Sequence, residues 1–269
     1  MSSDPATLDV SEPGAPVAVR ASTVLPALRE NFELTTADGL ILVGELALPA
    51  DGVVRATLIT LHPLPTHGGF MDSHVFKKAS YRLPAMAGIA VLRFNTRGTS
   101  SPRGTSAGAF DGGVGERLDL EAAVQFAADR GLPNRWLVGW SFGTELVLKY
   151  GALAPVAGLV EGAVLLSPPL HRAGDADLAA WAAGGLPLAV LVPEFDDYLR
   201  PEEARARFAL VPQARLVPVA GAKHLWVGEK YVVRALDEIA STVLGRAVAL
   251  PGEWPGAVGR GPAVSGRRA

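Results

Sequence analysis

A serine flanked by glycines is the residue of this chain whose setting points most directly to chemistry. Ser141 lies at the centre of the pentapeptide Gly139-Trp140-Ser141-Phe142-Gly143. In a Gly-x-Ser-x-Gly turn, small flanking residues let the backbone bend sharply, and the serine Oγ is presented where a base can activate it as a nucleophile. Chance alone produces this pattern in roughly one of six chains of this length, so the flanking sequence has to support it.

The sequence on both sides of Ser141 fits such a turn. Residues 135–138 form a short apolar, partly β-branched run after the turn signal Gly131-Leu132-Pro133-Asn134, which predicts a strand. From 144 to 154, apolar residues recur at helical spacing. A strand, a tight turn and a helix therefore meet at Ser141, and this context favours a nucleophile over an ordinary turn serine.

An acid and a histidine follow in the order that a serine nucleophile requires. One predicted strand ends in Pro193-Glu194-Phe195-Asp196-Asp197, and the last predicted strand is followed by His224. Side chains just beyond the carboxyl ends of parallel strands can meet at one edge of a sheet. We expect His224 to act as general base towards Ser141, and we expect Asp196 to orient the imidazole.

Both partners of the serine have alternatives. Asp197 is the alternative acid, and the Asp-Asp pair also fits a solvated turn before Pro201-Glu202-Glu203, where a helix N-terminus favours negative charge. His224 is alternatively an incidental loop histidine. The order Ser141, Asp196, His224 favours the catalytic interpretation.

Acyl transfer also needs backbone N–H groups that donate to the developing oxyanion. The residue after the nucleophile, Phe142, is expected to supply one of them. The second is expected from the segment His62-Pro63-Leu64-Pro65, which follows an early strand-like run. Because proline has no amide hydrogen, Leu64 is the donor that this segment offers. A rigid proline-rich loop without a catalytic role is the alternative.

The histidines of this region do not have the spacing of a metal site. His62, His67 and His74 match neither paired cysteines nor closely spaced ligands on a helix, so we expect no metal. We expect His62 instead to brace its loop by hydrogen bonding.

The remaining pattern predicts an α/β architecture. Two strands flank the hairpin signal Asp38-Gly39, and six further apolar runs alternate with helical stretches. This alternation predicts a mostly parallel sheet with helices on both faces, led by an antiparallel pair. The expected strands include 32–35, 40–46, 56–61, 89–94, 135–138, 162–166, 188–192 and 214–219, and the expected helices include 114–128 and 228–244.

Composition limits the classes of protein and partner. The chain has 269 residues, of which 49% are hydrophobic, enough for one domain with a substantial core. A net charge of −2 without basic clusters predicts no nucleic-acid partner, and no apolar run is long enough to predict a membrane span. There is no cysteine for a disulfide, and residues 1–5 do not resemble a secretory signal, so we expect a cytoplasmic location.

The two ends of the sequence differ from its centre. Residues 1–28 are rich in Pro, Ala and Ser, and residues 246–269 are rich in Gly, Pro and Arg. We expect a flexible N-terminal arm, a domain at 29–245 and a C-terminal tail, with apolar positions such as Val24, Leu25 and Trp254 available for docking. The sequence does not specify an oligomeric state.

Taken together, these motifs resemble the α/β-hydrolase superfamily, and within it small bacterial serine hydrolases that lack a large lid and are related to the dienelactone hydrolases. The resemblance spans roughly residues 30–245. It implies the α/β-hydrolase fold with an eight-stranded sheet, carboxylesterase-type chemistry on a small-molecule acyl substrate, and no cofactor. The segments that carry it, besides the pentapeptide, Asp196 and His224, are His62-Pro63-Leu64-Pro65, Gly68-Gly69, Arg93-Phe94-Asn95-Thr96-Arg97-Gly98, Phe110-Asp111, Gly115-Glu116 and Asp119.

Two positions depart from this family pattern. Pro193 stands where similar proteins usually have glycine, and Glu145 stands where a small residue is expected. Glu145 is expected either to pair with a basic residue such as Arg97 or to face solvent. The absence of cysteine also excludes the thiol nucleophile of the dienelactone hydrolases themselves.

Access to the site is expected to be open. Lid domains of this superfamily commonly enter after the strand at 162–166, but here only residues 167–187 precede the next strand, which leaves room for a short helix. Leu178 and Trp181 of this segment are expected in the core, with a place in the acyl pocket as the alternative. Thioesterase, acyltransferase and peptidase activity on the same triad, and a non-catalytic binding protein of the same fold, are alternatives to a carboxylesterase.

Overall fold

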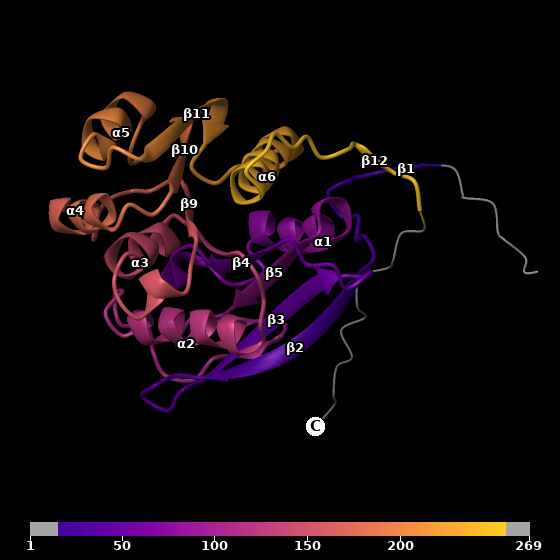
Figure 1. Cartoon of the computed structure of the whole chain (residues 1–269), viewed down its shortest axis with the longest axis horizontal. Coiled ribbons are helices and arrows are strands. Elements are labelled where there is room, and N and C mark those ends of the chain that lie inside the picture. Colours follow the sequence, from indigo (N-terminus) through magenta and orange to yellow (C-terminus); the bar gives the residue numbers. More distant parts are fainter. Residues whose placement is uncertain (1–15, 257–269) are drawn as a thin grey trace, which may run out of the picture.

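An eight-stranded sheet forms the centre of the structure, a computed structural model that describes residues 16–256 (Figure 1). Strand β3 runs antiparallel to both of its neighbours, and the other pairs are parallel. The predicted mostly parallel sheet with a leading antiparallel pair is confirmed. In their order across the sheet, the strands are β2 (Ala27–Thr35), β3 (Ile41–Pro49), β5 (Ile89–Phe94), β4 (Ala56–Leu61), β8 (Arg135–Trp140), β9 (Gly162–Leu166), β10 (Leu188–Phe195) and β11 (Ala214–Lys223).

Helices cover both faces of this sheet (Figure 1). On one face lie α1 (His74–Ala87) and α6 (Glu229–Leu244). Every residue of β4 and β5 is buried, as expected for apolar parallel strands between two helical layers. Each face has its own hydrophobic cluster. The opposite face is covered by α2 (Glu116–Asp129), α3 (Phe142–Tyr150), α4 (Asp175–Gly184) and α5 (Pro201–Phe208).

The hairpin between β2 and β3 turns at the predicted position. Gly39 has a φ of 82°, and its N–H donates to the Thr36 carbonyl at 2.9 Å. Because glycine adopts positive φ without steric cost, the Asp-Gly pair closes this turn tightly.

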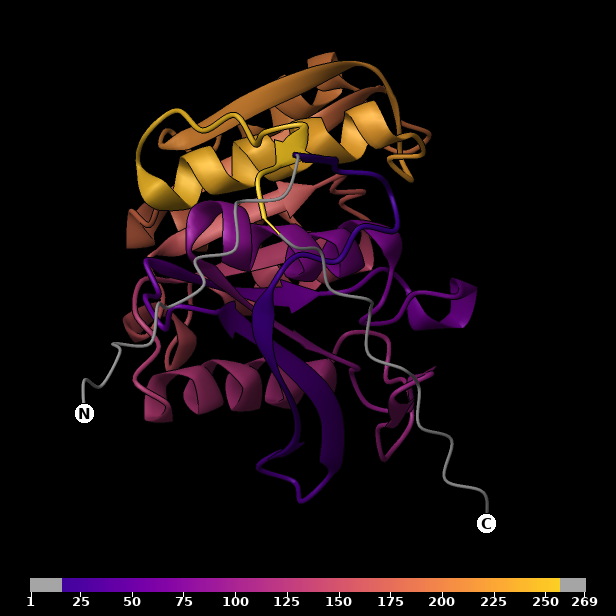
Figure 2. The same ribbon diagram turned by 90° about the vertical axis from the view of Figure 1, so that its right-hand side faces the viewer.

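Parts of both predicted arms pack against the domain (Figure 2). Strand β1 (Val17–Ala18) pairs with β12 (Glu253–Trp254), which brings the first and last described segments together. Leu25 is 1% exposed, and its N–H donates to the Tyr81 carbonyl at 3.0 Å. Residues 16–28 and 246–256 are therefore structured because apolar side chains and backbone pairing anchor them, whereas residues 1–15 and 257–269 lie outside the described part.

The connection between β9 and β10 contains only the short helix α4. Leu178 and Trp181 of this helix are fully buried in the core, which confirms their predicted packing. Within residues 16–256 there is consequently no lid domain at this position. No helix in the same range has both the length and the apolar character required to cross a bilayer.

Candidate active site

Ser141 occupies a sharp turn between β8 and α3. Its backbone has φ 52° and ψ −114°, a conformation that non-glycine residues adopt rarely and that commonly marks a functional position. A Cβ at Gly139 would lie 2.6 Å from the Gly143 carbonyl carbon, and a Cβ at Gly143 would lie 1.9 Å from the Leu61 carbonyl oxygen. Both glycines are therefore required by close backbone approach, as the pentapeptide suggested.

The structure brings the predicted serine, histidine and aspartate into one hydrogen-bonded series. The Oγ of Ser141 lies 2.9 Å from Nε2 of His224. The Nδ1 of the same imidazole lies 3.0 Å from both carboxylate oxygens of Asp196. These side chains follow the carboxyl ends of β8, β11 and β10, so the parallel sheet gathers them at one edge.

Of the two neighbouring aspartates, Asp196 is the one that contacts the imidazole. It is buried, and its Oδ1 also accepts hydrogen bonds from the backbone N–H of Tyr198 at 2.9 Å and Leu199 at 3.4 Å. Burial alone would raise the pKa of Asp196, but the hydrogen bond and charge of His224, with these amides, hold it below its ordinary value. Asp196 therefore stays ionised beside the imidazole, whereas Asp197 is exposed.

A group of side chains that the sequence did not single out holds the backbone of His224. Its carbonyl oxygen accepts hydrogen bonds from Trp140 Nε1 and Ser167 Oγ, both at 3.2 Å. Trp226 Nε1 donates in turn to Ser167 Oγ at 2.9 Å. No spacing pattern signals these contacts, because the three side chains come from separate parts of the chain. Together they fix the loop that carries the imidazole.

The two expected oxyanion donors lie at the same pocket. Leu64 and Phe142 both line it together with Ser141 and His224. Within residues 16–256, neither backbone N–H donates a hydrogen bond to a protein acceptor. The carbonyl of Leu64 accepts from the N–H groups of His67 and Gly69, both at 3.0 Å, which fixes the loop after β4. Two amides are thus available beside the serine, and their function as donors remains a proposal.

His62 braces this loop, as predicted. One ring nitrogen, Nδ1, lies 2.7 Å from the Pro63 carbonyl, and Nε2 accepts the Thr96 N–H at 3.1 Å. Burial lowers the pKa of His62 to about 4, and the hydrogen bond to Pro63 offsets only part of this effect. The ring is therefore neutral, with the proton on Nδ1. In the described range, no three His, Asp or Glu side chains gather in a way that suits a metal ion.

Both alternatives predicted for Glu145, pairing with a basic residue such as Arg97 and facing solvent, are wrong. Glu145 is fully buried and accepts hydrogen bonds from three consecutive backbone N–H groups, those of His171 at 2.8 Å, Arg172 at 3.0 Å and Ala173 at 2.5 Å. Helix α3 directs this carboxylate to the segment after β9, whereas Arg97 lies against α2 and binds Asp119 at 2.8 Å. Glu145 thus fixes one wall of the pocket.

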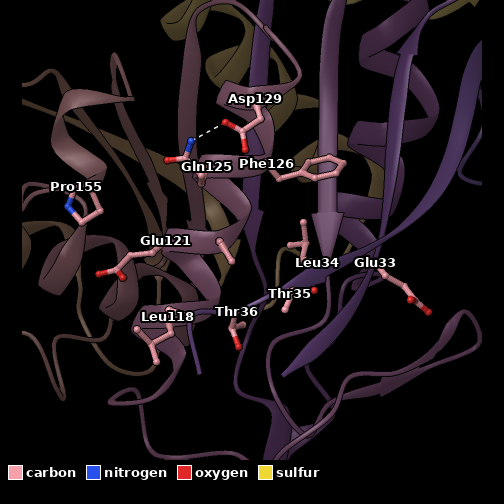
Figure 3. Close-up of a pocket in the computed structure, with 12 residues that line it drawn as sticks. Glu33, Leu34, Thr35, Thr36, Leu118, Glu121, Gln125, Phe126, Asp129 and Pro155 are labelled. Atoms are coloured by element: carbon pink, nitrogen blue, oxygen red, sulfur yellow. Dashed lines mark hydrogen bonds between the residues drawn. The ribbon is translucent and has the colours of Figure 1, made fainter. Parts of the chain in front are cut away.

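The pocket at Ser141 is small, with a volume of about 160 Å³. A larger hollow of about 460 Å³ lies elsewhere, between the end of β2 and helix α2 (Figure 3). No residue of the hydrogen-bonded series lines that larger hollow. The residues that line the small pocket are Pro63, Leu64, His67, Ser141, Phe142, Pro169, His171, Arg172, Tyr198, His224 and Leu225.

Solved structures that are similar to this chain include α/β serine hydrolases, and the first of these is described as having no lid. One from Xanthomonas campestris is 26% identical, with a TM-score of 0.61 and with 82% of this chain and 94% of that chain covered. A serine hydrolase homologue from Coxiella burnetii is 25% identical, with a TM-score of 0.64 and coverage of 80% and 96%. An esterase from Pyrococcus furiosus, 18% identical with a TM-score of 0.66 over 83% of this chain and 97% of that chain, shares the fold.

Sequence comparison gives a more limited match. An uncharacterized protein of Rickettsia prowazekii is 29% identical over 150 residues, which are 55% of this chain and 59% of that relative's length. A scan against protein-family models finds no match. The strand order, the turn at Ser141 and the two serine-hydrolase structures lead to the same assignment. The chain is a small member of the α/β-hydrolase superfamily, with no lid domain within residues 16–256.

Proposed function

We propose that this protein is a serine hydrolase that cleaves carboxylic esters through an acyl-enzyme on Ser141. The observation that carries the proposal is the series Ser141 Oγ, His224 Nε2, His224 Nδ1 and Asp196, with contacts of 2.9 and 3.0 Å. A nucleophile, a base and an orienting acid at hydrogen-bond distance are the arrangement that acyl transfer by serine requires.

In the proposed first step, Ser141 Oγ attacks the acyl carbonyl carbon while Nε2 of His224 takes the hydroxyl proton. The carbonyl oxygen becomes an oxyanion, which accepts hydrogen bonds from the amides of Phe142 and Leu64. As the C–O bond to the alcohol breaks, Nε2 returns the proton to the leaving oxygen. Asp196 stabilises the imidazolium that exists between these two transfers.

In the second step, water attacks the carbonyl carbon of the acyl-enzyme and gives a proton to Nε2. The same amides hold the second oxyanion, and the Ser141 oxygen leaves with the proton from His224. The acid product is released and the enzyme is restored. These steps use only side chains and amides of the chain and need no cofactor.

The surroundings of the pocket favour small or surface-accessible esters. Within the described residues no lid domain covers the site, and its volume of about 160 Å³ suits short groups near the reacting carbonyl. Thioesterase, acyltransferase and peptidase activity would use the same machinery with a different leaving group or acceptor. A small-molecule acyl substrate and a cytoplasmic location stay predictions of the sequence.

A fluorophosphonate probe with a fluorescent tag tests the proposal. It is expected to label the wild-type protein and to leave Ser141→Ala unlabelled, while hydrolysis of 4-nitrophenyl esters falls at least about 10⁴-fold in this variant. Thr66→Ala, which removes an exposed hydroxyl of the neighbouring loop, is the matched control and keeps labelling and activity. A folded wild-type protein that neither reacts with the probe nor hydrolyses esters is a binding protein of this fold, and the proposal is then wrong.

A further inference from the structure

Several basic side chains and no carboxylate line the pocket at Ser141. The lining residues include Arg172 and the histidines His67, His171 and His224, and they include no aspartate or glutamate. Asp196 lies behind His224, and both of its carboxylate oxygens contact Nδ1 of that imidazole. A substrate in this pocket therefore meets cationic and basic groups without a competing carboxylate.

Arg172 is held in place beside the reacting residues. Its Nε donates to the Gly112 carbonyl at 3.0 Å, and its guanidinium carbon lies 5.3 Å from the centre of the Phe142 ring. Phe142 directly follows the nucleophile and lines the same pocket. Stacking on an aromatic face and one backbone hydrogen bond orient the guanidinium in advance of binding.

The outer nitrogens of this guanidinium are available. Within residues 16–256, Nη1 and Nη2 of Arg172 make no hydrogen bond and no ion pair. The nearby carboxylate of Glu145 does not bind them, because its oxygens accept the N–H groups of residues 171–173. Glu145 thus fixes the backbone that carries Arg172 without neutralising its side chain directly.

We propose that the pocket selects esters that carry a carboxylate, and that Arg172 binds this group. The inference rests on the proposed ester hydrolysis. The two Nη groups of a guanidinium match the two oxygens of a carboxylate, and the small volume of the pocket suits this group better than a bulkier phosphate. Arg172 determines which esters bind well and takes no part in breaking the ester bond, because that step uses Ser141, His224 and the two amides.

Matched ester pairs test the inference. Mono-4-nitrophenyl adipate and 4-nitrophenyl hexanoate differ only in a terminal carboxylate in place of a methyl group on the acyl side. 4-Acetoxybenzoate and 4-acetoxybenzamide provide the corresponding comparison on the alcohol side. We expect the wild-type enzyme to show a higher kcat/KM for the anionic ester in at least one pair, and this preference to fall as sodium chloride is raised.

The same pairs are then measured with Arg172→Gln. The ratio of kcat/KM for the anionic ester to that for the neutral ester is expected to fall about five- to tenfold, a modest change because the side chain is exposed. Arg172→Lys keeps the charge without the two-pronged geometry and is expected to give an intermediate ratio. Arg207→Gln, an exposed arginine of α5 that pairs with Asp175, is the control and leaves the ratio unchanged.

The outcomes separate this inference from the proposed function. Hydrolysis of the neutral esters without an anionic preference in either pair overturns the selection of carboxylates and leaves the serine hydrolase intact. A preference that is equal in wild type and folded Arg172→Gln shows that another group binds the carboxylate, and it overturns the role of Arg172. Absence of hydrolysis with every ester overturns the proposed function itself.

Discussion

The hollow at Ser141 and the hollow between β2 and α2 differ in both size and chemistry. The larger one, about 460 Å³, lies between β2 and α2, and its lining contains no histidine, lysine or arginine (Figure 3). The smaller one has a volume of about 160 Å³ and is lined by Ser141 and His224, whose Oγ and Nε2 atoms lie 2.9 Å apart. Leu64 and Phe142, whose backbone N–H groups are available, line it as well. Volume alone would select the region without the serine and the histidine, because chemistry depends on which polar groups converge and not on the size of a hollow.

The charge of the two hollows is also opposite. Glu33, Glu121 and Asp129 line the larger hollow, where Asp129 accepts a hydrogen bond from Gln125 at 2.7 Å. Arg172 is the arginine that lines the smaller hollow, and no aspartate or glutamate lines this hollow. The same type of substitution should therefore change ester hydrolysis or stability strongly near the smaller hollow and weakly at the larger one. Matched pairs of variants test whether the smaller hollow is the active site.

The largest expected effect follows from replacing aspartate by asparagine at three positions. Asp196→Asn is expected to lower kcat for ester hydrolysis about 10⁴-fold, because the amide no longer holds the imidazole of His224 in the tautomer that can accept the serine proton. Asp197→Asn and Asp129→Asn are expected to stay within about twofold of the wild type, since neither contacts the histidine. Steady-state kinetics with one 4-nitrophenyl ester measures all three variants.

The control for this series is the fluorescence of the fluorophosphonate adduct under long incubation, which shows that the Asp196→Asn variant remains folded around Ser141. A large loss in Asp197→Asn with little loss in Asp196→Asn would contradict the assignment of the acid. A large loss in Asp129→Asn would instead contradict the distinction between the two hollows.

Much of the sheet and the location of the site could be predicted because they depend on local signals. Apolar runs and glycine turns are properties of short segments, and parallel strands bring their carboxyl ends to one edge. The order of Ser141, Asp196 and His224 is visible directly in the sequence. The hairpin at Asp38-Gly39 and the bracing role of His62 were also predicted, the latter because the histidine spacing did not fit a metal site.

Contacts between distant segments could not be predicted in the same way. The carboxylate of Glu145 binds amides 26 to 28 residues further along the chain, and nothing in either segment specifies that partner. Likewise, Ser167 meets Trp226 and the His224 carbonyl only after β9 and β11 are placed in the sheet. Val24 and Leu25 were expected to be available for docking and are buried, but the segment that receives them, with the Tyr81 carbonyl as partner of the Leu25 N–H, could not be predicted.

A second matched pair replaces glutamate by glutamine at Glu145, which lies behind the wall of the smaller hollow, and at Glu121, which lines the larger one. Glu145→Gln is expected to lower the free energy of unfolding by about 3 kcal/mol. The buried NH2 group of glutamine would replace one of the two oxygens that accept backbone hydrogen bonds, so that one donor would face another donor. Glu121→Gln, which removes an exposed ion pair with Arg117, is expected to change it by less than about 0.5 kcal/mol. Urea unfolding monitored by tryptophan fluorescence measures both.

The activity of Glu145→Gln sharpens the role assigned to this residue. If Glu145 fixes the wall that carries Arg172, the preference for anionic over neutral esters should fall more than kcat for the neutral ester does. Equal stability of Glu145→Gln and the wild type would show that the three amide contacts contribute little, and the pocket wall would then need another explanation.

Acid sensitivity at His62, the buried histidine that braces the loop beside the small hollow, provides a smaller effect. His62 has a pKa lowered to about 4 in the folded protein, whereas an unfolded chain binds its proton near pH 6.5. Below pH 6.5 the unfolded state therefore gains a proton that the folded state does not, so the stability conferred by the neutral ring is full above pH 6.5. It is lost as the pH falls towards 4, by about 2 kcal/mol at pH 5.

Urea unfolding of wild type and His62→Gln between pH 7.5 and 5 measures this contribution. The variant is less stable at neutral pH, but its free energy of unfolding is expected to decline less on acidification, since it lacks the titrating ring. Other ionisable groups contribute equally to both proteins, so the difference isolates His62. Parallel curves for the two proteins would contradict a lowered pKa at this position.

The smallest expected effect comes from the larger hollow itself. Gln125→Ala removes the hydrogen bond to Asp129 on an exposed face of α2, so the free energy of unfolding should change by less than about 0.5 kcal/mol. Ester hydrolysis should keep its kcat/KM within about twofold, because no contact joins this residue to the series at Ser141. A loss above about tenfold in a variant of unchanged stability would show that the two hollows are energetically coupled, and that the acidic one takes part in the function of the other.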